Sequence, residues 1–227
     1  MNTRRSVSIL IVLVAVAAIL GLGGWGFSRS GWGMMGGGYG MMGDYGVSYE
    51  SGESGESISN EEATAVAQNV IAGYRNPDLE VAEIMAFSNH FYVQAREQST
   101  GRYAFEFLID RGNGRTHAEP GPNMMWNTKY GHMSWLRWLP WVSSSGEMSI
   151  SREEARKIAQ EYLARTRFDL VVDDETDAFY GYYTLHTLRD GKIAGMLSVN
   201  GSSGRVWMHT WHGEFIGMLL GGDDEHE

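Results

Sequence analysis

The sequence contains the same pattern twice, and this repetition constrains the fold more than any other feature of the chain. The segment Ile58–Ala63 (ISNEEA) returns as Ile150–Ala155 (ISREEA), and Val66–Gln68 (VAQ) returns as Ile158–Gln160 (IAQ). Both pairs are separated by 92 residues, from 58 to 150 and from 66 to 158. Solenoid repeats have a period of roughly 20–50 residues. The longer period therefore predicts a duplicated small domain, and so two domains within the 227 residues.

Each copy is predicted to open with an amphipathic helix. Ser59 with Glu62, and Ser151 with Glu154, have the spacing of a capping box at a helix start. Apolar residues then follow at helical spacing in both copies: Ala63, Val66, Ala67, Val70 and Ile71, and then Ala155, Ile158, Ala159, Tyr162 and Leu163. The small residues in each stripe would let a flat sheet approach closely. The paired glutamates at 61–62 and 153–154 are interpreted as capping residues in first helical turns, where the helix dipole favours acid.

The segments after each helix alternate in polarity, which predicts β-strands. We expect one hairpin of Phe91–Glu97 with Arg102–Asp110, and another of Tyr180–Leu188 with Ile193–Val199. Tyr103, Phe105, Phe107 and Ile109 should share one face of the first hairpin, and Asp190-Gly191 is a strong signal for a tight turn in the second. A further turn follows in each copy, at 110–115 and 200–205, and leads to a final strand. The predicted fold class is α+β, with one helix on an antiparallel sheet, built twice.

This order of elements resembles the PepSY domain. The resemblance rests on Ser-x-x-Glu-Ala at each helix start, on the hairpin, and on Asp110 or Asn200 a few positions before Gly-Arg. It covers roughly residues 57–117 and 148–213 and implies two cystatin-like domains in tandem. Such domains occur in propeptides of thermolysin-like metallopeptidases, where they inhibit the enzyme or assist its folding, and in membrane-anchored regulatory proteins of the envelope. The family has no shared catalytic residues, and the chain carries no His-Glu-x-x-His motif of a zinc peptidase.

The N-terminus is predicted to be a membrane anchor. Arg4 and Arg5 precede an uncharged run at residues 6–27. As a helix, residues 7–27 would be about 31 Å long, enough to cross a hydrocarbon core of about 30 Å. The arginines should stay in the cytoplasm, which places the rest of the chain outside it. A cleaved signal peptide is the alternative, with Ala15-Val16-Ala17 as the cleavage motif.

The remaining segments complete the expected division of the chain. It consists of an anchor at 1–27, a flexible linker at 28–57, PepSY-like domains at 58–118 and 149–217, a Trp/Met/Pro-rich connector at 119–148 and an acidic tail at 218–227. The connector holds four of the eight tryptophans, which we expect to pack between the two domains. A groove for a partner or ligand is the alternative for this connector.

No metal site is predicted in the folded domains. Thioethers select Cu(I), so Met34, Met35, Met41 and Met42 of the linker form an alternative copper site, helped by Met124, Met125, Met133 and His132. His209 and His212 are expected on a strand, where their spacing sends them to opposite faces. The acidic segment 173–177 lacks the turn glycine and distal glutamate of an EF-hand and is expected to be a solvated loop.

These features predict a non-enzymatic protein. The net charge of −10 disfavours nucleic-acid binding, which needs a basic face. The chain has no cysteine, so it has neither disulfides nor a thiolate nucleophile. We expect no cofactor, contact with the membrane through residues 6–27, and binding of another envelope protein. The alternatives are copper handling by the linker and inhibition of a separate secreted peptidase.

Overall fold

The computed structural model describes residues 57–132, 134, 147–166 and 168–221, which belong to one compact unit. The predicted anchor at 1–27, the linker up to residue 56 and the tail from residue 222 lie outside these described residues. Within the described part, no helix is both long and apolar enough to cross a membrane. The predicted anchor therefore stays a prediction.

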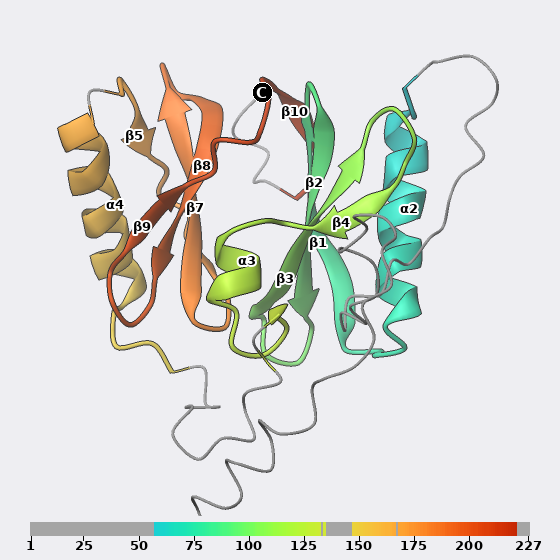
Figure 1. Ribbon diagram of the computed structural model, residues 1–227, viewed down its shortest axis with the longest axis horizontal. Helices are drawn as coiled ribbons and strands as arrows, with labels where there is room; N and C mark the ends of the chain where they lie inside the picture. The colour runs from blue at the N-terminus through green and yellow to red at the C-terminus, as the bar shows by residue number, and fades with distance from the viewer. Residues whose placement is uncertain (1–56, 133, 135–146, 167, 222–227) are drawn as a thin grey trace, which may run out of the picture. The chain divides into compact units, whose positions relative to one another are not determined.

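The first half of the described chain is one helix on an antiparallel sheet. Its elements are α2 (Asn60–Gly73), β1 (Leu79–Phe87), β2 (His90–Glu97), β3 (Tyr103–Asp110) and β4 (Thr116–Ala118). The predicted capping box is present, since Glu62 N–H donates to Ser59 Oγ at 3.1 Å and Ser59 N–H donates to Glu62 Oε2 at 2.8 Å. The apolar stripe of α2 is buried against the sheet. This packing fixes the helix on one face of the sheet (Figure 1).

The second half repeats this arrangement. Its elements are α4 (Arg152–Thr166), β5 (Val171–Val172), β6 (Asp177–Ala178), β7 (Tyr182–Arg189), β8 (Lys192–Asn200) and β9 (Val206–Met208), and a short helix α3 (Pro122–Met125) precedes them. The sheet order is β5-β7-β8-β9, with β6 also paired to β7. The Asp190-Gly191 turn is confirmed, and both residues have positive φ (53° and 77°), as a type I′ hairpin requires. The α+β class with antiparallel sheets is thus confirmed.

The two halves share one turn in detail, at the ends of β3 and β8. Asp110 and Asn200 each accept hydrogen bonds, through a side-chain oxygen, from the backbone N–H groups two and three residues later. Gly114 and Gly204 then adopt the same left-handed conformation, with φ of 68° and 69°. Only glycine enters this region without strain. The Gly-Arg pairs of the sequence are therefore explained by turn geometry.

The C-terminal strand departs from the predicted division. β10 (Phe215–Leu220) pairs with β1, so the first sheet has the order β10-β1-β2-β3-β4 (Figure 1). We predicted that residues up to 217 belong to the second repeat and that a tail starts at 218, but the strand continues to Leu220. Phe215, Met218 and Leu219 pack against apolar residues of the first half, and the backbone of β10 satisfies an edge that would otherwise be open to pairing with another chain.

The two sheets face each other, and the helices lie on their outer faces (Figure 1). Each outer face is apolar. In the first half, Phe105, Phe107 and Ile109 point to α2 as predicted, but Tyr103 does not follow them. A register irregularity between Ala95 and Arg96 shifts the end of the β2–β3 pair. The Tyr103 ring accordingly lies 5.3 Å from that of Phe179 in the second half.

A polar layer between the two sheets as the candidate functional site

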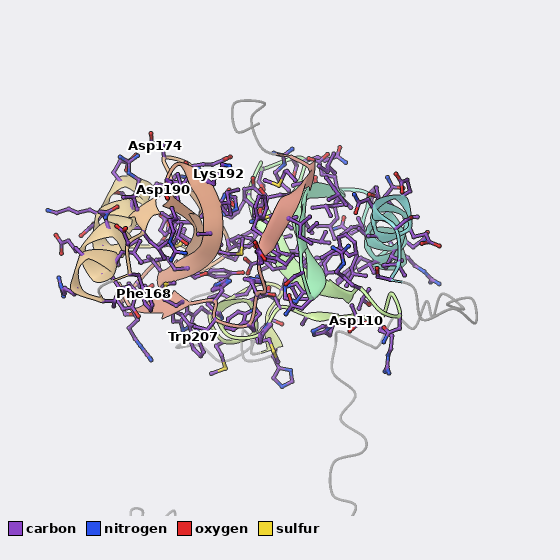
Figure 2. All side chains as sticks on the ribbon, turned by 90° about the horizontal axis from the view of Figure 1, so that it is seen from above. Asp110, Phe168, Asp174, Asp190, Lys192 and Trp207 are labelled. Atoms are coloured by element: carbon purple, nitrogen blue, oxygen red, sulfur yellow. The ribbon has the colours of Figure 1, made fainter. Side chains whose placement is uncertain are left out.

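The inner faces of the two sheets carry buried polar side chains, which we call the inter-sheet layer. Because side chains alternate along a strand, the residues between the apolar ones of each outer face all point inward. The members of the layer are Glu83, Tyr92, Gln94 and Glu106 of the first sheet, Asp177, Tyr182, Thr184, His186 and Ser198 of the second, and Glu119 and His209 of the loops. Figure 2 shows side chains filling the space between the sheets. Every member is less than a tenth exposed.

Glu106 is the centre of this layer. Its Oε1 accepts from Tyr92 Oη at 2.5 Å and from Thr184 Oγ1 at 3.0 Å, and its Oε2 accepts from Tyr182 Oη at 2.6 Å. Burial raises the pKa of Glu106 to about 7, although the two tyrosine hydroxyls act in the opposite direction. The carboxyl group of Glu106, in the first sheet, is therefore held by the hydroxyls of Tyr182 and Thr184 of the second sheet.

Hydrogen bonds continue from this centre in both directions. Towards one end, Thr184 Oγ1 contacts Ser198 Oγ at 3.0 Å, and Ser198 Oγ contacts His209 Nε2 at 2.9 Å. Towards the other end, Gln94 Nε2 donates to Tyr92 Oη at 3.0 Å and to Asp177 Oδ2 at 2.8 Å. The layer is one connected network between two groups of ionisable side chains.

The first group, the Glu119 cluster, consists of Glu119, His209 and His212. His209 Nδ1 and His212 Nε2 each lie 3.3 Å from Glu119 Oε1, and Trp211 Nε1 donates to the same oxygen at 2.8 Å. Burial alone would raise the pKa of Glu119, but the two imidazoles outweigh it and hold this pKa at about 2. The carboxylate is thus an anion enclosed in protein.

The prediction that His209 and His212 point to opposite faces is wrong. β9 ends at Met208, and residues 209–214 form a loop rather than a strand. Strand alternation therefore does not apply, and both rings turn to Glu119. His212 Nδ1 also lies 2.6 Å from His90 Nε2. Burial lowers the pKa of His90 to about 4 and also lowers that of His212, so this pair is neutral at pH 7.

The second group, the His186 cluster, consists of Glu83, Asp177 and His186, with Asp173 nearby. His186 Nε2 lies 3.6 Å from Glu83 Oε1, and His186 Nδ1 lies 3.9 Å from Asp173 Oδ2. Burial raises the pKa of Asp177 to about 7, with Glu83 contributing. Burial would lower the pKa of His186, but the surrounding carboxylates raise it to about 9. An imidazolium ion here lies among three acidic side chains.

The expectation of a solvated acidic loop at 173–177 is therefore wrong in part. Asp174 and Glu175 are exposed, whereas Asp173 and Asp177 are 8% and 4% exposed. Asp177 lies on β6, whose pairing with β7 directs its side chain into the layer.

Lys129 and Tyr130 of the connector take part in a third contact between the two halves. The carboxylate of Glu97 accepts from Lys129 Nζ and Tyr130 Oη, both at 2.5 Å, and from Tyr180 Oη at 2.6 Å. Trp126 lies edge-on to Trp207 of β9, with ring centroids 5.7 Å apart. Trp126 of the connector therefore packs against the second half, and Trp135, Trp138 and Trp141 lie outside the described residues.

An open groove of about 1020 Å³ lies where α4 and the β5–β6 segment meet the first sheet. Its lining is of mixed charge: Arg96, Tyr103, Arg152, Arg156, Lys157, Gln160, Asp174 and Asp177, among others. Arg156 pairs with Asp174 at 2.6 Å, and Arg152 donates to the Thr176 carbonyl at 3.0 Å. The groove is thus polar, with much of its charge already compensated.

The linker methionines of the alternative copper site, Met34, Met35, Met41 and Met42, lie outside the described residues. The sequence analysis missed Glu106, Glu119 and His90. Glu106 and His90 stand at alternate positions of apolar strands, a pattern typical of solvent-facing residues, and Glu119 lies in a loop after β4 that carries no motif.

Comparison with known proteins gives one distant structural similarity. No protein-family model matches the chain, and no curated protein sequence matches it. Among solved structures, the chain is similar to the Bacillus megaterium YpeB C-terminal domain, with 12% identity and a TM-score of 0.24. The match covers 67% of this chain and 62% of that chain.

Proposed function

We propose that this chain is a non-enzymatic binding protein of PepSY type, anchored in the membrane through residues 6–27 and working outside the cytoplasm. The observation that carries the proposal is the burial of the ionisable groups. Glu106, whose pKa is raised to about 7, is fully buried between the sheets, and His186, whose pKa is raised to about 9, is 4% exposed there. Asp177, whose pKa is also raised to about 7, borders the groove beside α4 but is only 4% exposed. An acid or base must come within hydrogen-bonding reach of its substrate. These groups are better suited to holding the halves together than to catalysis.

The proposed binding surface is the open groove where α4 and the β5–β6 segment meet the first sheet. It joins both halves, so a ligand there would contact each of them. Its cationic side chains alternate with acidic ones, which favours a polar polypeptide segment of mixed charge over a polyanion. A segment of another envelope protein fits this description.

Photo-crosslinking in intact cells tests the proposal on the full chain. A photoreactive amino acid replaces the exposed Gln160 in the groove, and the exposed Asn69 on α2 serves as the matched control. We expect a discrete protein adduct from position 160 but not from 69. The adduct should be lost when Arg152→Glu and Lys157→Glu are combined.

Two outcomes would contradict the proposal. The binding part fails if both positions give the same adducts or neither gives any. The non-enzymatic part fails if the purified chain chemically converts the captured protein and a single substitution in the described part abolishes that conversion.

A further inference from the structure

Three buried atoms of the Glu119 cluster have no hydrogen-bond partner. These atoms are Glu119 Oε2, His209 Nδ1 and His212 Nε2. Their side chains are 0%, 0% and 2% exposed, so bulk water does not satisfy them. Leaving such an atom unpaired costs roughly 1–3 kcal/mol. The two ring nitrogens converge on the Glu119 carboxylate, each 3.3 Å from its other oxygen, Oε1, which points to a bound group that satisfies them.

We infer that Glu119, His209 and His212 bind one divalent transition-metal cation of the zinc type, joining the two halves of the molecule. This inference is independent of the proposed binding function. Its basis is the distances between the candidate ligand atoms. Zinc bonds of about 2.0–2.1 Å in a tetrahedron place neighbouring ligand atoms about 3.3–3.4 Å apart. Both ring nitrogens lie 3.3 Å from Glu119 Oε1.

The outer nitrogens of both rings already have the partners that metal-bound histidines need. A histidine ligand usually engages its second ring nitrogen in a hydrogen bond, which fixes the ring and its tautomer. Here Ser198 Oγ lies 2.9 Å from His209 Nε2, and His90 Nε2 lies 2.6 Å from His212 Nδ1. The remaining nitrogen of each ring is thereby left for the cation.

The backbone around the cluster is fixed from three directions. Glu119 follows β4, and its N–H donates to the Glu106 carbonyl at 3.1 Å. His209 N–H donates to the Met196 carbonyl of β8 at 3.0 Å. The loop carrying His212 is held by Asn89, which donates to the Trp211 carbonyl and accepts from Gly213 N–H, both at 2.9 Å. The ligand atoms are therefore positioned before any ion arrives.

The ligand set selects the kind of metal. Two imidazoles and one carboxylate suit zinc and its neighbours, whereas magnesium and calcium prefer oxygen ligands throughout. The His186 cluster fits less well, since His186 Nε2 lies 3.6 Å from Glu83 Oε1, farther than neighbouring ligand atoms of a tetrahedral zinc site.

Metal titration of the full-length chain tests this site. The purified protein is stripped with a chelator and titrated with Zn²⁺ or Co²⁺, and the visible spectrum of bound Co²⁺ reports the geometry. All variants carry Leu in place of Met34, Met35, Met41 and Met42, so that the linker does not contribute. We expect one equivalent of metal per chain and the absorption of four-coordinate Co²⁺.

Matched variants separate this site from other metal binding. His209→Gln and His212→Gln should each weaken Zn²⁺ binding more than tenfold, and His90→Gln, next to a ligand, by about tenfold. The exposed His117→Gln on β4 is the matched control and should bind as the parent does. Equal binding by all four variants, or no binding by the parent protein, overturns the inference.

A measurement on the parent protein keeps the test decisive if the ligand variants do not fold. X-ray absorption of the zinc-loaded parent should show nitrogen and oxygen neighbours with the scattering pattern of two imidazoles. Zn²⁺, but not Mg²⁺, should also raise its thermal midpoint. A spectrum without imidazole scattering, or equal midpoints with both ions, rules the site out.

Discussion

Tyr92 of the first sheet and Tyr182 of the second donate hydrogen bonds to the two oxygens of a single carboxylate, that of Glu106. Both rings are fully buried. The carboxylate therefore depends on both sheets for its hydrogen bonds. If the sheets separated, it would lose the hydrogen bond from Tyr182. This shared acceptor makes the polar layer a cooperative contact rather than a set of independent bonds.

The first prediction concerns this shared acceptor. Tyr92→Phe and Tyr182→Phe should each lower the free energy of unfolding by about 1–3 kcal/mol, because each removes a donor to a buried carboxyl group. Their effects should not add, with a coupling of at least about 0.5 kcal/mol in a double-mutant cycle from urea denaturation. The control is Tyr183→Phe, whose hydroxyl donates instead to the Ile150 carbonyl at 2.7 Å. Additive effects of Tyr92→Phe and Tyr182→Phe would contradict the prediction.

The second prediction is a pH dependence of stability that originates at Glu106. Burial raises its pKa from 4.5 to about 7 on folding. The folded protein then keeps a proton that the unfolded chain releases at lower pH, so stability is lost as the pH rises from about 4.5 to above 7. Relative to that of Glu106→Gln, the free energy of unfolding of the wild type should fall by about 3 kcal/mol over this range.

Urea denaturation at pH 5 and pH 8 measures this difference. The exposed Glu161→Gln on α4 is the matched control for replacing a glutamate by its amide. If the free energies of unfolding of the wild type and Glu106→Gln differ by the same amount at both pH values, Glu106 does not titrate between pH 5 and pH 8.

Much of the secondary structure followed from local pattern. The Ser59 capping box, the β2–β3 hairpin and the Asp190-Gly191 turn are short-range features whose chemistry is written in adjacent residues. The repeat also predicted which turns correspond. β1 (Leu79–Phe87) was missed, because Glu80 and Glu83 interrupt its apolar residues at positions that do not alternate regularly. The irregularity between Val81 and Glu83 in its pairing with β2 explains this pattern.

The candidate site could not be predicted, because it depends on how two sheets meet. Polar residues on one face of a strand normally face water. Gln94 and Glu106 follow that pattern in the sequence, and only a second sheet makes them buried. Likewise, the convergence of Glu119 with His212 joins positions far apart in the chain through a loop whose path no local motif specifies.

The third prediction concerns β10. Ending the chain after Gly213 removes Phe215, whose ring centroid lies 5.8 Å from that of Phe87, and Met218, which pairs with Met85. The loss of apolar contacts should destabilise the protein by about 3–5 kcal/mol and expose β1. Urea denaturation and binding of a hydrophobic dye measure these effects. Removal of residues 222–227 alone is the control, and equal stability of the two truncated chains would contradict the prediction.

The fourth prediction tests the proposed location. The chain contains no cysteine, so one introduced cysteine reports on one site. Lys192, at the exposed end of the β7–β8 hairpin, is a suitable position (Figure 2). Lys192→Cys should react with a membrane-impermeant maleimide in intact cells. Asn2→Cys, on the predicted cytoplasmic side, should react only after lysis. The opposite pattern would reverse the proposed orientation.

The pairing of β10 with β1 also has a consequence for biosynthesis. Strands β1 to β4 are translated first, but the outer edge of their sheet has to wait for residues 215–220, about a hundred positions after β4, to leave the ribosome. At roughly 5–20 residues per second, this interval is on the order of ten seconds. Throughout that time the nascent chain presents an open strand, and a chaperone or a neighbouring polypeptide could occupy the position that β10 takes at the end.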